Sequence, residues 1–594
     1  MPGILADALK KNPNHKLYFY KKDGEWKSHS NLDLWKTIPS LGFGLMALDV
    51  KKQDKVAILS ENSPEWCFFD WTCSHFNFVS VPIYQTSIPK QIQYILNHSE
   101  AKVAVVSTRE QLTKIVSIKD KLKHLKHVIM LDNNTYDESW ILNYNELKEL
   151  GCTQKLRTDI SMADIAAEIK ADDLWSIIYT SGTSGNPKGV MISHFNMAAN
   201  IQQTEHFTKF KHHRRWLSFL PLSHSFERHS SLYCAWVGAE FYFSESIVKV
   251  PENLKEVRPQ YMTTVPRLLE KVYAGVIENI LAGPKAKQEI FNWAQRVGHR
   301  VVNKYLKYNK RPIGPLAIKY TMAKKLVFDK VADIFGSEFS RCICGGAPLA
   351  TEIGEFFLMA GIKVQEGFGL TEMSPITHGN PLDNLKFGYV GKAYPDVETK
   401  IAEDGEILLK GPNLMKGYYK GSDESAEAID KDAWFHTGDI GFVDQEGFLK
   451  ITDRKKNLIV TAGGKNIAPA GVEREICASK FIEQAVVIGD RRKYLVAIVI
   501  PSLEIIQKWG KKESPSLSFK KYEDMVNSRE VRELIQNELD ENQKDLARYE
   551  QIKYFYIPPQ AFTIETGELT ASLKIKRNEI INKYSQEIEN MYAN

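Results

Sequence analysis

Short apolar segments alternate with helical patterns over the first third of the chain. Residues 54–60 (DKVAILS) and 101–107 (AKVAVVS) carry unbroken apolar runs, which are typical of buried strands. Between them, residues 89–98 (PKQIQYILNH) have the spacing of an amphipathic helix. Residues 174–180 (LWSIIYT) form another predicted strand. Strand, helix and strand in this order predict an α/β fold with a largely parallel sheet.

A change of pattern near residues 453–456 predicts a domain boundary. Before it the sequence is rich in glycine and strand-like segments. After it come compact apolar runs, a charged helical region and a short tail. We interpret residues 1–453 as a large N-terminal domain and residues 457–594 as a separate, smaller α+β domain, joined by a short linker.

Residues 281–330 differ from the rest of the chain in charge. They contain 12 Lys and Arg but two Asp and Glu, interleaved with Trp293, Tyr305, Tyr308 and Tyr320. One interpretation is a solvated helical insertion. The other is a basic amphipathic surface that faces anionic lipid, which would give the protein a peripheral membrane contact. The moderate apolar content leaves both open.

Composition excludes several classes of protein. Of the 594 residues, 43% are hydrophobic and 25% charged, and the 78 basic and 73 acidic residues nearly balance. Such a balance argues against a nucleic-acid partner. The seven cysteines include no CxxC pair, so a reducing cytoplasm is expected rather than a disulfide framework or a zinc site. We find no signal peptide and no apolar run of about 18 residues, the length that would predict a membrane span.

A phosphate-binding loop is predicted where the strand 174–180 ends. Residues 179–194 read YTSGTSGNPKGVMISH. Hydroxyl groups can donate to phosphate oxygens, glycines let backbone N–H groups approach, and a lysine adds a charge-assisted contact. A Walker loop would place its lysine at a helix start, but this lysine stands between Pro187 and Gly189. The predicted phosphate-binding residues are Thr180, Ser181, Gly182, Thr183, Ser184, Gly185 and Lys188.

This loop resembles the signature of the adenylate-forming (AMP-binding) enzymes, which include acyl-CoA synthetases, luciferases and peptide-synthetase adenylation domains. Residues 220–228 (LPLSHSFER) resemble the long-chain fatty acyl-CoA synthetases, with the bubblegum-type subgroup nearest. The resemblance implies parallel α/β sheets with a β-barrel-like part, followed by a small mobile α+β domain. It also implies ATP, Mg²⁺ and coenzyme A. A carboxylate attacks the α-phosphate of ATP to give acyl-AMP and pyrophosphate, and coenzyme A then takes the acyl group.

The resemblance also assigns roles to residues of the large domain. Glu372 matches the magnesium-binding glutamate, and hard cations prefer such oxygen ligands. Thr371 would contact the α-phosphate. Asp439 would bind both ribose hydroxyls, with Arg454 as a further ribose contact. The expected adenine-side residues are Gly345, Gly346, Ala347, Pro348, Phe368 and Gly369.

Residues of the predicted hinge and of the predicted small domain complete the site. Lys456 matches the hinge residue of a 454–456 hinge, and Lys574 in LTASLKIKR (569–577) matches the catalytic lysine. A cation beside the α-phosphate would stabilise charge that develops in the transition state. The coenzyme A side is expected at Gly463, Gly464 and Lys465. Two positions depart from the family pattern: Val460 replaces a lysine, and Ala571 replaces a proline ahead of Lys574.

His224 is expected near the substrate carboxylate. Four residues later, Arg228 replaces the aromatic gate of some relatives, and we expect it to pair locally with Glu227. The long-chain form of this motif and the basic insertion favour a fatty acid. A ligase that loads a carrier protein, a luciferase-like oxygenase and a non-catalytic acyl-binding protein are alternatives. The oligomeric state and the preferred chain length are not decided by the sequence.

Overall fold

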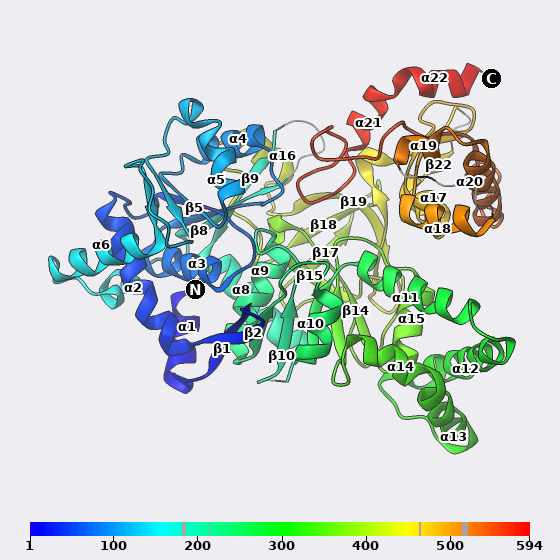
Figure 1. Ribbon diagram of the computed structural model, residues 1–594, viewed down its shortest axis with the longest axis horizontal. Helices are drawn as coiled ribbons and strands as arrows, with labels where there is room; N and C mark the ends of the chain where they lie inside the picture. The colour runs from blue at the N-terminus through cyan, green and yellow to red at the C-terminus, as the bar shows by residue number, and fades with distance from the viewer. Residues whose placement is uncertain (181–185, 212, 463–464, 514–518, 520, 594) are drawn as a thin grey trace.

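The computed structural model describes residues 1–594 except 181–185, 212, 463–464, 514–518, 520 and 594. Within these residues the chain forms two large mixed sheets, a four-stranded antiparallel sheet, and two small sheets near the C-terminus. The predicted α/β class is therefore confirmed. In Figure 1 the C-terminal elements lie at the upper right, apart from the first large sheet on the left.

The first large sheet contains all the strands predicted from the early apolar runs. Its strands run parallel except for the antiparallel pair β8–β9. The predicted helix 89–98 is α4 (Pro89–Ser99). The order across the sheet is β7 (Ile141–Asn143), β6 (His127–Met130), β5 (Val103–Val106), β3 (Lys55–Leu59), β4 (Val79–Ile83), β8 (Leu174–Thr180) and β9 (Lys188–Ser193).

The second large sheet has a parallel centre and antiparallel edges. Helix α9 (Ser225–Val237) follows β10, and helix α11 (Pro266–Leu281) follows β12. The order is β16 (Lys392–Ala393), β15 (Ile376–Gly379), β14 (Lys363–Gly369), β13 (Arg341–Cys344), β12 (Tyr261–Thr264), β10 (Arg215–Ser218), β11 (Glu240–Phe243), β1 (Lys16–Lys22) and β2 (Glu25–Ser30).

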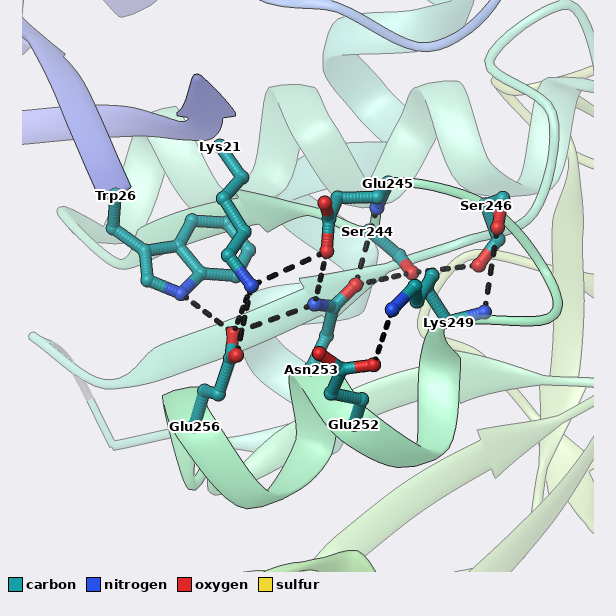
Figure 2. A network of polar contacts seen from close by, with 9 residues as sticks. All are labelled: Lys21, Trp26, Ser244, Glu245, Ser246, Lys249, Glu252, Asn253 and Glu256. Carbon is teal, nitrogen blue, oxygen red and sulfur yellow. Dashed lines mark hydrogen bonds and ion pairs between the residues drawn. The ribbon is translucent and has the colours of Figure 1, made fainter. Parts of the chain in front are cut away.

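A polar network fixes the edge of this second sheet (Figure 2). Lys21 of the β1–β2 hairpin contacts Glu256 of α10 (Val250–Val257) at 2.7 Å and Glu245 at 3.4 Å. The indole of Trp26 donates to the same Glu256 carboxylate at 3.0 Å, and the Asn253 amide donates to Glu245 at 2.9 Å. The network therefore holds the hairpin, α10 and the segment after β11 together.

The remaining strands lead to the C-terminus. The antiparallel sheet consists of β17 (Glu398–Ile401), β18 (Glu406–Lys410), β19 (Phe435–Val443) and β20 (Leu449–Arg454). The last two sheets pair β21 (Ile459–Val460) with β22 (Asn466–Ile467), and β23 (Ile482–Ile488) with β24 (Leu495–Pro501) and β25 (Ile552–Tyr556). Their helices are α17 (Pro469–Ile476), α18 (Leu503–Glu513), α19 (Tyr522–Val526), α20 (Arg529–Asn542), α21 (Arg577–Lys583) and α22 (Ser585–Ala593).

These C-terminal elements have buried clusters of their own. One surrounds Ile482 and Leu495, and the other surrounds Val486 and Ile580. The predicted linker runs into a short 3-10 turn at Lys455–Asn457. No helix among the described residues is long and apolar enough to cross a membrane.

Candidate active site

A cavity of about 3330 Å³ lies between the large sheets and the C-terminal elements. Most of the predicted site residues line it, although they come from distant parts of the chain. Those are Thr180, Lys188, His224, Gly345, Gly346, Ala347, Phe368, Gly369, Thr371, Glu372, Arg454, Lys456 and Lys574. Seven further predicted residues lie outside the described part of the chain: Ser181, Gly182, Thr183, Ser184, Gly185, Gly463 and Gly464.

Three predicted residues are not on the lining of the cavity. Pro348 follows the lining residue Ala347 and is exposed. Asp439 is buried behind Arg454. Lys465 is exposed in the C-terminal part, where its Nζ lies 5.9 Å from the ring centre of Tyr549.

The phosphate side of the cavity is built on the hairpin β8–β9. Thr180 and Lys188 are register partners at the end where the loop leaves the sheet. The Lys188 Nζ lies 4.9 Å from the ring centre of Tyr418. The Tyr418 hydroxyl donates to Glu372 Oε1 at 3.1 Å. One tyrosine thus contacts both the predicted phosphate-binding lysine and the predicted metal-binding glutamate.

Glu372 and Thr371 occupy a short 3-10 turn, Thr371–Met373, after β14. Gly369 is required just before this turn, because a side chain there would place its Cβ 1.9 Å from the Pro375 carbonyl oxygen. The Thr371 hydroxyl lies 3.2 Å from the Ser225 hydroxyl at the start of α9. Desolvation raises the pKa of Glu372, and the Tyr418 hydrogen bond and the charges of Arg454 and Lys574 oppose that rise.

Asp439 and Arg454 are direct neighbours across the β19–β20 pair. The Arg454 Nε lies 3.1 Å from Asp439 Oδ1. Burial raises the pKa of Asp439, while the charges of Arg454 and Lys574 act in the opposite direction. The sequence motifs predicted that these residues act together, and the sheet register shows why they meet.

Lys574 is presented by a tight turn near the C-terminus. Its backbone N–H donates to the Thr570 hydroxyl at 3.0 Å, and Leu573 within the turn has a positive φ of 61°. The side chain remains accessible from the cavity. Desolvation nevertheless lowers the pKa of Lys574, and the charge of Arg454 lowers it further. The charges of Asp439 and Glu372 act in the opposite direction. The lysine therefore lies within electrostatic reach of Glu372 and Asp439 of the predicted large domain and of Arg454 at the predicted hinge.

His224 begins helix α9 as its N-cap residue. Its Nδ1 accepts a hydrogen bond from the Phe226 backbone N–H at 3.1 Å, so the proton of the neutral ring belongs on Nε2. Desolvation, with the charge of Lys574 as a second cause, lowers the pKa of His224 to about 3. This histidine is consequently neutral at physiological pH and can donate a hydrogen bond into the cavity.

The expected pairing of Glu227 with Arg228 is wrong. Arg228 is fully buried and pairs with Asp70 instead, with its Nε 2.9 Å from Asp70 Oδ2. Glu227 accepts a hydrogen bond from the Thr263 hydroxyl. Consecutive residues of a helix point in directions about 100° apart, so they cannot form the local pair that their adjacency suggested.

Tyr418 and Ser225 are contacts that the motifs did not indicate. Ser225 directly follows His224, and Tyr418 stands in the GYYK segment at 417–420. Ser225 lies within the LPLSHSFER motif and Tyr418 lies in none of the motifs named above, and the hydrogen bond of each to the site depends on the folded arrangement of separate elements.

Comparison with known proteins places this geometry in a family. The model for the AMP-binding enzyme family matches residues 5–419, and the model for the C-terminal domain of AMP-binding enzymes matches residues 456–594. The chain belongs to the AMP-binding enzyme family. The bubblegum-type subgroup and the domain boundaries 1–453, 454–456 and 457–594 stay predictions.

Relatives of this family member resemble it over nearly its whole length. It is 31% identical to "Long-chain-fatty-acid--CoA ligase FadD15" of Mycobacterium bovis, with 99% of this chain and 96% of that protein covered. It is 30% identical to "Long chain acyl-CoA synthetase 6, peroxisomal" of Arabidopsis thaliana, with 96% and 82% covered. The crystal structure of the anthranilate CoA ligase AuaEII, in complex with anthranoyl-AMP, has a TM-score of 0.73 at 18% identity, with 99% and 98% covered. This structural likeness confirms the adenylate-forming fold.

Proposed function

We propose that this family member activates a long-chain fatty acid with ATP, giving acyl-AMP and pyrophosphate, and then transfers the acyl group to coenzyme A. The observation that carries the proposal is the convergence of Glu372, Asp439 and Arg454 with Lys574 around one cavity. Full-length similarity to proteins named long-chain-fatty-acid–CoA ligases supports the choice of acid and acceptor.

In this proposal the nucleotide lies beside the C-terminal ends of β13 and β14 and the middle of β19. The adenine packs against Gly345–Ala347 and Phe368, and Asp439 accepts hydrogen bonds from the ribose hydroxyls. Thr180 and Lys188 hold the phosphates together with the loop that follows β8. The fatty acid carboxylate attacks the α-phosphate, and Lys574 and Thr371 stabilise the charge that develops there. His224 would orient the carboxylate through its Nε2–H.

The residues present fit a magnesium ion at Glu372. The described residues contain no cluster of three or more His, Cys, Asp or Glu that could hold a metal. A single carboxylate suffices for Mg²⁺, because phosphate oxygens and water supply its other ligands. The hydrogen bond from the Tyr418 hydroxyl orients the Glu372 carboxylate. A metal ion bound there would neutralise part of the phosphate charge.

The acyl chain would occupy the apolar part of the cavity beyond His224. The apolar residues that line the cavity include Phe226, Ile343, Ile376 and Tyr394. Each buried methylene contributes about 0.8 kcal/mol, so a chain of about 16 carbons supplies on the order of 10 kcal/mol. That gain favours a long acid over a short one.

For the second step we propose that Lys456 is the hinge and that Gly463, Gly464 and Lys465 approach the coenzyme A side. Gly463 and Gly464 lie outside the described residues. Transfer to the thiol of a carrier protein is the alternative. A cytoplasmic location stays a prediction.

The test is a comparison of the two half-reactions in a Lys574→Ala variant. With ATP, Mg²⁺ and palmitate, pyrophosphate release should fall about 10²–10³-fold, the loss expected for one preorganised donor. Thioester formation from preformed palmitoyl-AMP and coenzyme A should be nearly unchanged. Lys553→Ala, on β25 and away from the cavity lining, is the matched control. Absence of pyrophosphate release by the wild type would refute the proposal, and equal loss of both half-reactions would refute the role of Lys574.

A further inference from the structure

Helix α13 (Gly314–Ala323) presents apolar side chains to solvent. Ile318 is 67% exposed, Met322 is 53% exposed, and Leu326, in the π-helical turn Lys324–Phe328 that continues the helix, is 47% exposed. Residues four apart in a helix lie on one face. These three side chains, which we call the α13 stripe, therefore form one row.

The opposite face of α13 packs against the protein. Tyr320 follows Ile318 by two positions, or about 200° around the helix axis, and its hydroxyl donates to the Met359 carbonyl at 2.9 Å. Tyr320 and Ala323 are buried in the cluster that includes Phe328 and Met359. The face of α13 that packs against the protein therefore has apolar residues of its own. The exposed α13 stripe is a second apolar face of the same helix.

Exposed basic residues precede and interleave with the α13 stripe along the chain. Lys310, Arg311, Lys319 and Lys325 are exposed, and no carboxylate of the described residues lies within ion-pair distance of them. Lys324 has a partner, Asp329, at 3.4 Å. The preceding loop adds Ile313, which is 70% exposed. Isolated exposed apolar residues are common on proteins, but a row flanked by unpaired cations marks an interaction surface.

We propose that the α13 stripe and its flanking cations dock on an anionic lipid bilayer. Apolar side chains on one side of a helix, with lysine and arginine beside them, are the composition of helices that lie in a membrane interface. The cations would approach the negative headgroups while Ile318, Met322 and Leu326 enter the boundary between headgroups and acyl chains. Charge complementarity favours a lipid surface over a second copy of this chain, whose corresponding surface carries the same positive charge.

The position of this surface connects it to the cavity. Helix α13 packs against α12 (Lys285–Lys304), and α12 follows α11, whose Ile277 and Leu281 line the cavity. In Figure 1, α13 lies at the lower right end of the molecule, beyond α11 and α12. If the proposed function holds, a docked molecule would hold this wall of the cavity near the membrane from which a long-chain acid comes. The lipid contact itself does not depend on that function.

Vesicle binding of the full chain tests the proposal without any substrate. The probes are vesicles of phosphatidylcholine alone and vesicles of phosphatidylcholine and phosphatidylglycerol in equal parts, read out by co-sedimentation. The wild type should bind the anionic vesicles at least about tenfold more tightly, and the preference should shrink as salt rises. The triple variant Ile318→Ser, Met322→Ser, Leu326→Ser should bind them about tenfold more weakly.

A matched control uses exposed apolar residues outside α13 and its neighbours. Leu156, Ile160 and Phe195 are 90%, 51% and 47% exposed, and their triple serine variant should bind as the wild type does. Helix α6 (Tyr144–Leu156), which ends at Leu156, lies at the left of Figure 1. Equal thermal midpoints of the two triple variants would show that both fold.

Two results would overturn the proposal. One is equal binding of the wild type to both kinds of vesicle. The other is a stripe variant that binds anionic vesicles like the wild type; a change of that variant from dimer to monomer in light scattering would then make the stripe a contact between copies. Pyrophosphate release from ATP and detergent-solubilised palmitate, without vesicles, should be the same in all variants. Its absence from the wild type as well would count against the proposed function and leave the lipid result unaffected.

Discussion

The carboxyl group of Glu227 is buried within helix α9, beside the cavity but not on its lining. Desolvation raises its pKa from 4.5 to about 8, although the hydroxyls of Ser218 and Thr263 favour the charged form. In the folded protein this carboxyl therefore keeps a proton that the unfolded chain releases above pH 4.5. Because the folded state then binds more protons, its stability falls as the pH rises towards 8.

Glu227→Gln should remove this contribution. The amide stays neutral and can still accept the Thr263 hydrogen bond. The free energy of unfolding of the variant, relative to the wild type, should increase with pH by up to about 1.4 kcal/mol per pH unit between 4.5 and 8. Urea unfolding at a series of pH values measures this. Glu366, whose pKa burial also raises to about 8, is present in both proteins and cancels in the difference. A difference that does not change with pH would contradict the assignment.

Single residues of the site were predictable where a local motif carries them. Lys188, Glu372 and Lys574 each stand in a short segment whose residue types match their chemistry, and the structure brings all three to one cavity. The partners of Glu227 and Arg228 were not predictable. Glu227 contacts Thr263 and Arg228 contacts Asp70, and both partners lie on other elements, more than 30 residues away in sequence.

At the scale of elements, the Arg228–Asp70 pair ties α9 to α3 (Pro64–Phe76) and to the first large sheet. The guanidinium also donates to the hydroxyls of Ser176 on β8 and Ser80 on β4, and it lies 3.7 Å from the ring centre of Trp175. The side chain of Asp70 is 4% exposed. Removing one partner of such a pair leaves the other charge buried and unpaired.

Arg228→Met should therefore destabilise the protein by about 3–5 kcal/mol, measured by chemical denaturation. The double variant Asp70→Asn, Arg228→Met should recover part of that loss, because no buried charge then lacks a partner. Arg529→Met is the matched control. It breaks the 2.7 Å pair with Glu533 on the surface of α20, where Arg529 is 87% exposed, and should cost about 0.5 kcal/mol or less. A double variant that is less stable than Arg228→Met would argue against this account.

The elements themselves were partly predictable. The strands β3, β5 and β8 were found because their side chains are buried on both faces, which produces an unbroken apolar run. Strand β2 (EWKSHS) was not, since it lies at a sheet edge with most of its side chains half-buried and carries no such run.

In residues 281–330 the basic charge was visible in the sequence. The aromatic residues suggested an outward face, but Tyr320 packs inward and the aliphatic α13 stripe faces solvent.

At the scale of the whole molecule, polar contacts hold the C-terminal elements over the cavity. The Asp453 carboxylate at the end of β20 accepts a hydrogen bond from the Ala470 backbone N–H at the start of α17, at 3.1 Å. On the other side, Arg267 of α11 lies 4.0 Å from Glu483 of β23. Such contacts leave no apolar periodicity in the sequence. The arrangement of the two parts therefore could not be derived from the pattern that predicted their boundary.

The hydrogen bond that Asp453 accepts from Ala470 acts like a cap on helix α17 that is supplied by another part of the chain. Loss of a capping side chain costs about 1 kcal/mol, so Asp453→Ala should reduce the population of the arrangement that places Lys574 in the cavity by about fivefold. Pyrophosphate release should fall by up to that factor, whereas thioester formation from preformed acyl-AMP should not fall. Asp490→Ala is the control, since Asp490 accepts a backbone hydrogen bond from Val460 at 3.1 Å within the C-terminal part alone. If both half-reactions decline together in Asp453→Ala but not in the control, the contact supports the site itself and does not select between two arrangements of the molecule.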